Sequence, residues 1–363
     1  MKILAISVNR GSGTLKEVRA LAGAGVEIEW ALGDAPCVSY EEDLIPGTYS
    51  LFRNYIELEP ILRAFTGDLI VVHAQPVDPV LQAHAIRPDL PVIFAWRDIC
   101  GFTARKAVIL EQYAADRADA LMFYSETDRQ VAEEMYELGD KPRAVNLHYC
   151  NGRDYPPDLP EETDGIVYEG NISIDHECRD YRAIAKQITG LGLDFNIYPS
   201  EVSARYAPFY VETGANMHAT EPHRKMLESL THYDWAFVGG PSRSLQWAVA
   251  STNKVFDAIA AGVPIIAYKA SMTEDFVKTH NVGVVVEDLR EIPDIYHMHT
   301  DIRRRLKDQR WQFTMEGHIG DVVRFYEEVI QWNQKKEPKS SKQRKIAPQR
   351  RAQMPSLQLT PPL

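Results

Sequence analysis

A lysine and an aspartate at helical spacing carry the strongest chemical signal in this sequence. Lys254 and Asp257 lie three residues apart in the segment 251–262, which begins with Ser251 and Thr252. Either hydroxyl residue can cap a helix whose first N–H groups bind an anion, and Lys254 adds a point charge for a phosphate. Asp257 lies on the same side of that helix, where a carboxylate can accept hydrogen bonds from ribose hydroxyls. The segment predicts a nucleotide-diphosphate site; the alternative is a capped helix with an ordinary surface Lys–Asp pair.

Histidines and glycines near expected strand ends are further candidates. His73 ends an apolar run, where it either faces a ligand or bonds to the backbone as an ordinary strand-end histidine. Gly11 and Gly13 follow the first expected strand without the Gly-x-Gly-x-x-Gly spacing of a dinucleotide site, so we expect them near the acceptor or the transferred sugar. His297 and His299 have a His-x-His spacing but no evident third ligand in the sequence, and we predict no metal.

The elements that must position these residues belong to a large α/β protein. With 363 residues the chain exceeds one ordinary domain and fits two. Short apolar runs alternate with helical patterns, which is typical of parallel βαβ units. In the first half the expected strands are 2–8, 26–30, 68–73, 91–96, 120–124 and 144–149, with a helix at 15–23 after the first of them. In the second half they are 165–168, 194–198, 235–238, 263–268 and 282–286, with a last helix at 318–333.

An acidic, proline-rich stretch at 155–162 separates the two halves. We therefore expect two doubly wound domains that face each other across a cleft, so that two substrates meet beyond the C-terminal strand ends. The predicted divisions are an N-terminal acceptor domain at 1–152, a C-terminal donor domain at 153–333 and a tail at 334–363.

Charge is distributed unevenly between the tail and the rest of the chain. The tail 334–363 contains eight Lys or Arg residues and one acid, a net +7, which leaves −18 for the remainder of a chain whose net charge is −11. An acidic body argues against general binding to nucleic acid or anionic membranes. The tail has too few apolar residues to fold, and we expect it to be disordered, either as a solubilising end or as a contact to a polyanion.

Cysteine usage and hydropathy indicate the compartment. Cys37, Cys100, Cys150 and Cys178 lie far apart, which predicts reduced thiols and neither a disulfide framework nor a zinc site. The N-terminal apolar run is too short for a signal peptide, and no stretch reaches the roughly 20 apolar residues of a transmembrane helix. We expect a soluble, cytoplasmic protein.

Several stretches together resemble the retaining glycosyltransferases of the GT-B fold, in the family 4 group. The segment 251–268 is similar to their nucleotide-sugar signature, in which a Lys, a carboxylate and an Ala-Ala-Gly-x-Pro run close the donor site. Residues 151–154, Asn-Gly-Arg-Asp, resemble the turn that ends the first domain, and 326–332 resemble the C-terminal helix that returns to it. The resemblance implies two Rossmann-like domains across a cleft, with such a helix, over most of residues 1–333.

Carried over position by position, the resemblance assigns roles around the donor. It gives Asp257 the ribose and Lys254 a diphosphate oxygen, with Thr252 and Asn253 beside them at the start of the helix. Gly170 corresponds to the glycine after the first strand of the donor domain.

Two features of the family pattern are less complete here. A basic residue that neutralises the diphosphate is expected after the glycine, and Arg179, Arg182 and Arg243 are the candidates, although each is otherwise an ordinary surface arginine. The family usually has a pair of glutamates; the second falls on Asp257, whereas the first falls on Val249, which cannot serve.

The resemblance also points to residues near the reacting sugar. A family histidine in a His-Asp context after a strand of the first domain is replaced here by Arg97 followed by Asp98. We expect Arg97 to act as an electrostatic stabiliser that Asp98 orients, with His73 as a further catalytic candidate. Lysine, arginine and helix N-terminal amides can stabilise a departing diphosphate without a metal.

The implied function is glycosyl transfer from a nucleotide-diphosphate sugar, with a UDP-sugar favoured, with retention and without a cofactor. A sugar-nucleotide epimerase or a phosphorylase on the same fold is one alternative. A catalytically silent nucleotide-sugar-binding protein is another, favoured by the departures at Val249 and Arg97. The acceptor stays open among a saccharide, a lipid-linked saccharide, a protein, a small metabolite and a hydroxylated DNA base.

Overall fold

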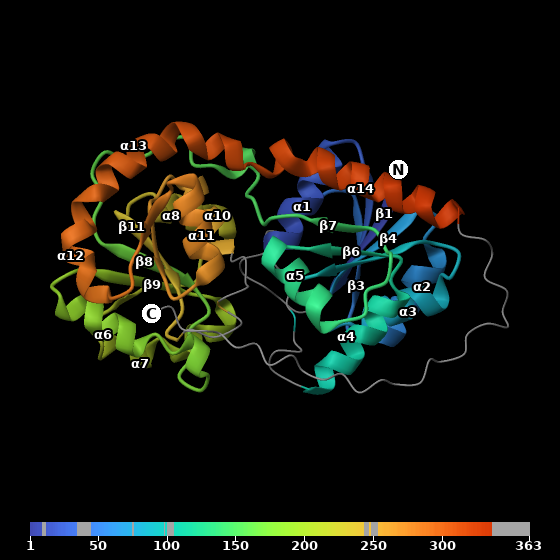
Figure 1. Ribbon diagram of the computed structural model, residues 1–363, viewed down its shortest axis with the longest axis horizontal. Helices are drawn as coiled ribbons and strands as arrows, with labels where there is room; N and C mark the ends of the chain where they lie inside the picture. Colours follow the sequence, from blue (N-terminus) through green and yellow to red (C-terminus); the bar gives the residue numbers. More distant parts are fainter. Residues whose placement is uncertain are drawn as a thin grey trace.

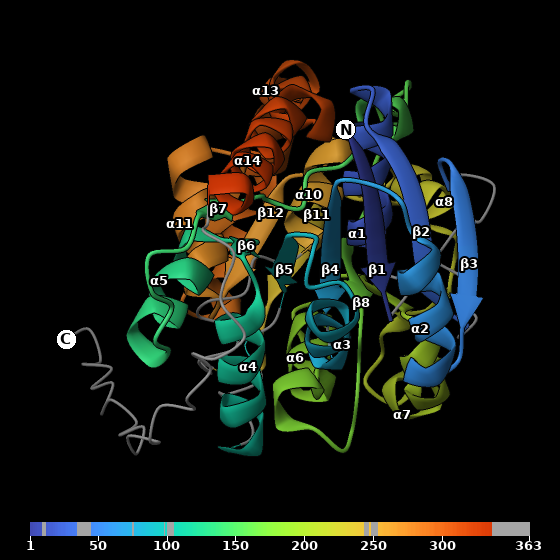
Figure 2. The same ribbon diagram turned by 90° about the vertical axis from the view of Figure 1, so that its right-hand side faces the viewer.

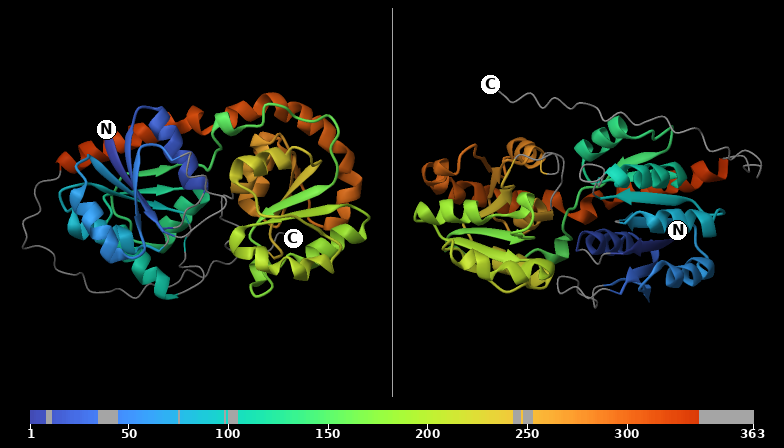
Figure 3. Two further views of the ribbon diagram at one scale, coloured as in Figure 1. Left: turned by 180° about the vertical axis from the view of Figure 1, so that it is seen from behind. Right: turned by 90° about the horizontal axis from the view of Figure 1, so that it is seen from below.

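Two separate parallel β-sheets organise the chain (Figure 1). The structure, a computed structural model, describes residues 1–8, 12–34, 45–74, 76–97, 99, 105–242, 247 and 253–335. The two sheets lie side by side, and the views from behind and from below show the same arrangement (Figure 3).

The first sheet has seven parallel strands in the order β3-β2-β1-β4-β5-β6-β7. They are β1 (Lys2–Ser7), β2 (Glu27–Gly33), β3 (Thr48–Phe52), β4 (Leu69–Ala74), β5 (Val92–Trp96), β6 (Ala120–Phe123) and β7 (Arg143–Val145). The helices between them are α1 (Ser12–Gly23), α2 (Tyr55–Ala64), α3 (Asp78–Ile86), α4 (Arg105–Arg117) and α5 (Glu126–Met135).

The second sheet has six parallel strands in the order β10-β9-β8-β11-β12-β13. They are β8 (Ile166–Gly170), β9 (Phe195–Pro199), β10 (Asn216–Met217), β11 (Trp235–Gly239), β12 (Ile265–Tyr268) and β13 (Gly283–Val285). The helices of this half are α6 (Arg182–Gly190), α7 (Pro208–Val211), α8 (His223–Leu230), α10 (Asn253–Ala260), α11 (Ser271–His280), α12 (Ile292–Ile295) and α13 (His299–Gln309). The last helix, α14 (Met315–Lys335), follows them.

Alternation along the central strand β1 explains why both faces of the first sheet are covered. Ile3 and Ala5 pack into one hydrophobic core with α1, whereas Leu4 and Ile6 pack into a second core with α2 and α3. Successive side chains of a strand point to opposite faces, so a continuous apolar run must be buried on both. The run that predicted a buried strand therefore produces a sheet with helices on two sides.

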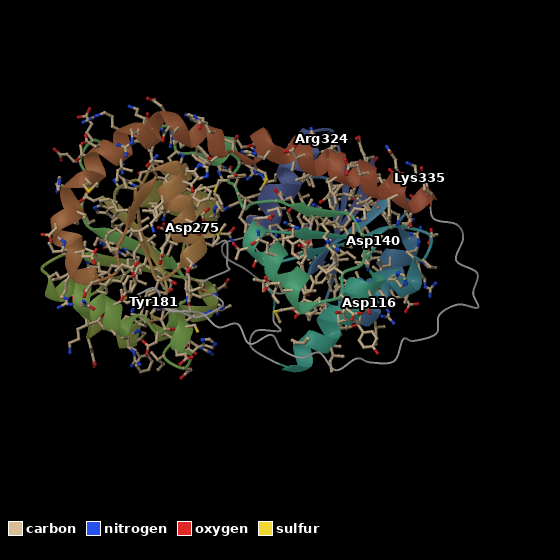
Figure 4. All side chains as sticks on the ribbon, in the orientation of Figure 1. Asp116, Asp140, Tyr181, Asp275, Arg324 and Lys335 are labelled. Carbon is tan, nitrogen blue, oxygen red and sulfur yellow. The ribbon has the colours of Figure 1, made fainter. Side chains whose placement is uncertain are left out.

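The C-terminal helix α14 returns from the second domain to the first. Arg324 and Lys335 lie on the part of α14 that runs along the first sheet's helices (Figure 4). The hydroxyl of Tyr326 donates a 3.0 Å hydrogen bond to the buried carboxylate of Glu17 on α1. The chain thus crosses between the domains again at the start of α14, where Met315 N–H donates to the Cys150 carbonyl.

Three strands differ from the sequence prediction, and one of them, the two-residue edge strand β10, was not predicted. The strand β3 was not predicted, because it forms an edge of the sheet and only Phe52 among its residues is buried, so it has no apolar run (Figure 2). The strand β7 ends at Val145 instead of residue 149, because the chain leaves the sheet after the Asn146 N–H donates to the Phe123 carbonyl. The extended stretch that follows leads to the second domain.

The start of α1 also differs from the prediction. The helix begins at Ser12, three residues before the predicted start at Leu15, so that Gly13 and Thr14 lie in its first turn. This places a helix N-terminus directly after the first strand.

The doubly wound α/β prediction is confirmed, whereas the division at residue 152 stays a prediction.

Cys150 and Cys178 are free thiols. Cys37, Cys100 and the tail beyond Lys335 lie outside the described residues. Among the helices that the structure describes, none has the length and apolar character needed to cross a membrane.

Candidate functional site

The topology places a candidate site at the carboxyl ends of the central strands of each sheet. Strand order reverses between β1 and β4 in the first sheet and between β8 and β11 in the second. Ligands of open α/β sheets bind beyond the carboxyl ends of the strands at such switch points. The helices α1 and α10 follow β1 and β11, so that their N-termini lie at these two points.

The first turns of α1 and α10 meet across the domains. A Cβ atom on Gly13 would lie 3.0 Å from His148 Nδ1 and 3.2 Å from Asn253 Oδ1. Both distances are tighter than ordinary carbon contacts, so a larger residue at Gly13 would require the side chains of His148 and Asn253 to shift. Gly13 and Asn253, predicted separately as an acceptor-side loop and a donor residue, thus lie in one site.

Several polar atoms at this junction are buried without a hydrogen-bond partner among the described residues. They are Thr14 Oγ1, His148 Nδ1 and Asn253 Oδ1. A buried polar atom left unpaired costs about 1–3 kcal/mol, so such a group of atoms indicates a place where a polar ligand binds.

The helix α10 forms because the sequence agrees with a helix at several positions. Val255, Phe256 and Ile259 are buried on its inner side. Gly262 follows with φ +67°, and its N–H donates to the Ile259 carbonyl, as in a glycine that ends a helix. A Cβ at Gly262 would lie 2.7 Å from Leu159 Cδ1, so the Ala-Ala-Gly run packs closely against the linker.

Lys254 lies in the first turn of α10 and points toward the end of β8. Its ammonium is 5.6 Å from the centroid of the Tyr168 ring. A Cβ on Gly170 would lie 2.7 Å from Lys254 Cε and 2.9 Å from Nζ, and Gly170 has φ +117°. Gly170 therefore provides both the backbone conformation and the space that Lys254 occupies.

A second cation approaches Lys254. Burial lowers the pKa of the Lys254 ammonium, and the charge of Arg179 lowers it further against the opposing effect of Glu169. Arg182, the other candidate in this loop, forms a 2.6 Å ion pair with Asp180 instead. Two neighbouring cations repel unless an anion lies near them, so Arg179 and Lys254 are suited to a diphosphate.

Asp257 is buried and accepts hydrogen bonds from both domains. Its Oδ1 atom receives the Lys16 ammonium at 2.7 Å, the His223 Nε2 atom at 2.9 Å and the Cys150 thiol at 3.0 Å. Lys16 lies on α1 in the first domain, whereas His223 begins α8 in the second.

Charge decides the protonation states around Asp257. Burial alone raises the pKa of Asp257, but Lys16 and His223 outweigh it and hold that pKa well below its usual range. Burial raises the pKa of Glu169 well above its usual range, and the charge of Asp257 adds to the effect. Burial lowers the pKa of Lys16, yet the charge of Asp257 prevails and raises it. Of these two carboxyl groups, Asp257 is thus the one that is held ionised.

The same cluster has donor atoms at metal-ligand spacing. One ligand atom each of Cys150, His223 and Asp257 lies within 4.8 Å of the others. The ammonium of Lys16 already supplies a positive charge at Asp257 Oδ1. The sequence prediction that no metal is used stays a prediction.

A second polar cluster lies in the first domain at the ends of β4, β5 and β6. His73 Nδ1 is 3.1 Å from the Tyr124 hydroxyl, which donates to Glu17 at 3.1 Å. Arg97 lies over the Tyr124 ring, 5.1 Å from its centroid, and His148 stacks on the same ring at 4.3 Å. His148 thus connects this cluster to Gly13 and the junction of the helices.

The charges of the first-domain cluster are arranged around Arg97. Burial, followed by the charge of Arg97, lowers the pKa of both His73 and His148 well below the usual histidine value. Both histidines are therefore neutral near pH 7. Nε and Nη2 of Arg97, and Nε2 of His73, are buried with no hydrogen-bond partner in the described part of the chain.

The predicted residues fall into three groups. Gly170, Arg179, Asn253, Lys254 and Asp257 lie around α10, and His73 and Arg97 lie in the first-domain cluster that His148 connects to Gly13. The remaining predicted residues, Gly11, Asp98, Arg243 and Thr252, lie outside the described residues.

The sequence did not indicate the residues that join the surroundings of α10 to the first-domain cluster. These residues are Lys16, Glu17, His148, Cys150 and Glu169. The available signal was modest: a Lys-Glu pair in the first helix directly after a glycine-containing loop, and a Glu directly before Gly170. None of these spacings indicates a contact to the other domain.

Comparison with known proteins agrees with this geometry. Residues 249–315, which include α10, match the family model of the glucosyltransferase 3-like C-terminal domain. No curated protein matches the chain in sequence.

Solved structures resemble the chain over nearly its whole length. A sucrose-phosphate synthase from Thermosynechococcus elongatus has a TM-score of 0.68 at 13% identity, covering 92% of this chain and 100% of its own. Anabaena HepE, in complex with UDP and glucose, has a TM-score of 0.66 at 11% identity, covering 89% and 99%. An α-glucosyltransferase in complex with UDP and a 13-mer DNA containing an HMU base has a TM-score of 0.64 at 12% identity, covering 91% and 99%.

These likenesses and the two parallel sheets lead to the same classification. The chain has the GT-B fold, and the family model and the solved structures that it resembles are those of glycosyltransferases.

Proposed function

We propose that this protein is a glycosyltransferase whose donor is a UDP-sugar bound at the N-terminus of α10. One observation carries the proposal. Lys254 is packed against Gly170 with Arg179 near it, and the same helix start faces Gly13 of the first domain. This arrangement offers two cations and two helix N-termini to one anion.

The proposed chemistry follows from those charges. A departing nucleotide diphosphate develops negative charge, which Lys254, Arg179 and the free N–H groups of α10 stabilise without a metal. Asp257 accepts hydrogen bonds from the ribose hydroxyls. Support for UDP comes from Anabaena HepE, whose structure contains UDP and glucose.

Arg97 and His73 are proposed to face the sugar that is transferred. A fixed cation beside neutral histidines provides electrostatic stabilisation without releasing protons. We further propose that Asp98 orients Arg97 and that the sugar is transferred with retention at the anomeric carbon. The cytoplasmic location, the domain limits 1–152 and 153–333 and the polyanion-binding role of the tail remain part of the same proposal.

The acceptor is proposed as a hydroxyl compound that enters from the first domain. A hydroxylated DNA base stays among the classes considered, since one similar structure contains a 13-mer DNA with an HMU base. An assay of acceptor-dependent UDP release tests this class beside the others, which are saccharides, lipid-linked saccharides, small metabolites and proteins.

A binding experiment with a matched control tests the donor site. Calorimetric titration of UDP, GDP and ADP into the full chain should give the tightest binding for UDP. Lys254→Gln should weaken UDP binding about tenfold or more, as expected for loss of a charged hydrogen bond. Lys225→Gln, which changes an exposed lysine of α8, should leave it unchanged.

Turnover distinguishes the alternatives. UDP release from UDP-glucose that depends on an added acceptor supports transfer, whereas a new sugar nucleotide formed from donor alone supports an epimerase. UDP binding without release on any acceptor indicates a silent binding protein. Equal UDP affinity of Lys254→Gln and the unmodified chain contradicts the proposed donor site.

A further inference from the structure

We propose that Lys16 is a positioning residue of the donor site, which reaches from the first domain and holds Asp257 as the carboxylate that binds ribose. The inference rests on the proposed function in one respect, the role of Asp257 toward ribose. It adds a residue of the other domain to that role.

The contact between Lys16 and Asp257 is short, buried and long-range. Lys16 Nζ lies 2.7 Å from Asp257 Oδ1, the side chains are 2% and 5% exposed, and 241 residues separate them in sequence. The backbone of Lys16 is fixed as well, because its carbonyl accepts a 2.7 Å hydrogen bond from Asn151 Nδ2. Lys16 is therefore held both at its backbone carbonyl and at its ammonium.

Lys16 also makes the largest contribution to keeping Asp257 ionised, ahead of His223. In the proposed function Asp257 lies near a diphosphate, whose charge disfavours a second negative charge beside it. His223 and Cys150 add hydrogen bonds to the same oxygen, but a thiol is a weak donor and carries no positive charge. The Lys16 ammonium is a full charge at hydrogen-bond distance from the carboxylate and therefore keeps it ionised.

A consequence concerns the two domains. Lys16 belongs to α1 and Asp257 to α10, so the carboxylate has its partner only while these helices are in contact. Affinity for the ribose thereby depends on a residue that lies outside the donor domain.

The same helix provides a matched control. Arg19, three residues after Lys16, forms a buried ion pair with Asp154 at 2.5 and 3.0 Å. Removing Arg19 breaks a buried charged contact of α1 just as removing Lys16 does, but it leaves the partners of Asp257 in place.

The experiment compares UDP with 2′-deoxy-UDP, which lacks one ribose hydroxyl. Calorimetry uses the full chain and the variants Lys16→Met, Lys16→Gln, Arg19→Met and Asp257→Asn. The unmodified chain and Arg19→Met should bind UDP about tenfold or more tightly than 2′-deoxy-UDP, as expected for a hydrogen bond to a charged group. Lys16→Met should reduce this preference to less than about threefold, within the range of a neutral contact.

Lys16→Gln keeps a hydrogen-bond donor without the charge, and provides the test if Lys16→Met does not fold. It should lose the preference as well. The proposal is overturned if either folded variant keeps the preference of the unmodified chain, or if it binds UDP more tightly, which would mean that Lys16 competes with ribose. It is also overturned if Arg19→Met loses the preference to the same extent, because Lys16 would then be only a structural contact.

Asp257→Asn separates this inference from the proposed function. If Asp257→Asn keeps the preference, or the unmodified chain has none, the ribose role of Asp257 fails and the inference fails with it. If Asp257→Asn loses the preference while both folded Lys16 variants keep it, the ribose role stands and only the role of Lys16 is wrong.

Discussion

Lys254 and Asp257 lie one turn apart on α10, yet their surroundings impose opposite demands. Lys254 has Arg179 as a neighbour, so it is poised for an anion. Asp257 has three hydrogen-bond donors on a single oxygen, Lys16 among them, which keeps it ionised although it is buried. A site that binds a nucleotide diphosphate needs both kinds of environment within the length of one nucleotide.

Replacement of Gly170 by alanine tests the space around Lys254. The added Cβ would meet Lys254 Cε at 2.7 Å, and φ +117° strains any side chain. We expect UDP affinity to fall about tenfold, because Lys254 must move from the diphosphate, and the free energy of unfolding to fall by about 1–3 kcal/mol. Calorimetry and urea unfolding measure the two effects.

Gly192→Ala is the matched control for this change. Gly192 also has a positive φ, +78°, but within the described residues nothing lies within 4 Å of its added Cβ. It should lose stability without losing UDP affinity. If both glycine variants bind UDP like the unmodified chain, Gly170 does not position Lys254.

The buried histidines of the first domain predict a pH dependence of stability. Burial lowers the pKa of His73 well below 6.5 in the folded protein, so below pH 6.5 the unfolded state binds more protons. The free energy of unfolding should therefore decrease as pH falls, by up to about 1.4 kcal/mol per pH unit from this histidine.

Urea unfolding of the full chain at pH 7.5 and 5.5 measures the effect. The difference between the two pH values should shrink in His73→Gln and persist in His232→Gln, which changes an exposed histidine. An unchanged difference in His73→Gln would show that this histidine is protonated in the folded protein.

At the scale of elements, the arrangement depends on how α1, α10 and α14 meet. The first turns of α1 and α10 face each other at Gly13 and Asn253. The helix α14 packs on α1 and reaches the first-domain cluster through Tyr326. One helix, α1, thus contacts both the donor helix and the C-terminal helix.

Loss of the Tyr326 hydroxyl tests this connection. Tyr326→Phe removes the 3.0 Å hydrogen bond to the buried Glu17 carboxylate and leaves the ring packing intact. We expect the free energy of unfolding to decrease by about 1–3 kcal/mol, as for other buried hydrogen bonds to a charged group. Tyr49→Phe on the exposed side of β3 should change it by less than about 0.5 kcal/mol. Equal stability of the two variants would mean that α14 is not held through Glu17.

The elements themselves were predictable to the extent that their signals are local. Strands β1, β4, β5 and β12 are buried apolar runs, and Gly262 marks the end of α10. The edge strand β3 has no such run and was missed. Lys16 and Asp257 lie 241 residues apart, and only the packing of two domains brings them together. The donor half of the site could therefore be predicted from one segment, but the residues that join the halves could not.

At the scale of the whole molecule, two doubly wound domains are joined by two crossings of the chain. The first runs through Cys150 and the second enters α14 at Met315, and the two crossings are hydrogen-bonded to each other. In addition, Lys16 and Arg19 of the first domain form ion pairs with Asp257 and Asp154. The domains are therefore linked by buried ion pairs as well as by the two chain crossings.

Deletion of residues 336–363 tests the separate role of the basic tail. All the residues proposed to bind the donor precede this segment, so UDP affinity should not change. The tail 334–363 carries a net +7 in a chain whose net charge is −11, so its loss should reduce binding to DNA and to anionic vesicles at low salt. Equal DNA and vesicle binding with and without the tail contradicts its role as a polyanion contact.

The most direct test of the donor assignment is a crystal structure of the full chain with UDP. We expect the diphosphate at the N-terminus of α10, within hydrogen-bond distance of Lys254 Nζ, and the ribose hydroxyls at Asp257. UDP bound away from α10, or a ribose that does not contact Asp257, would contradict it.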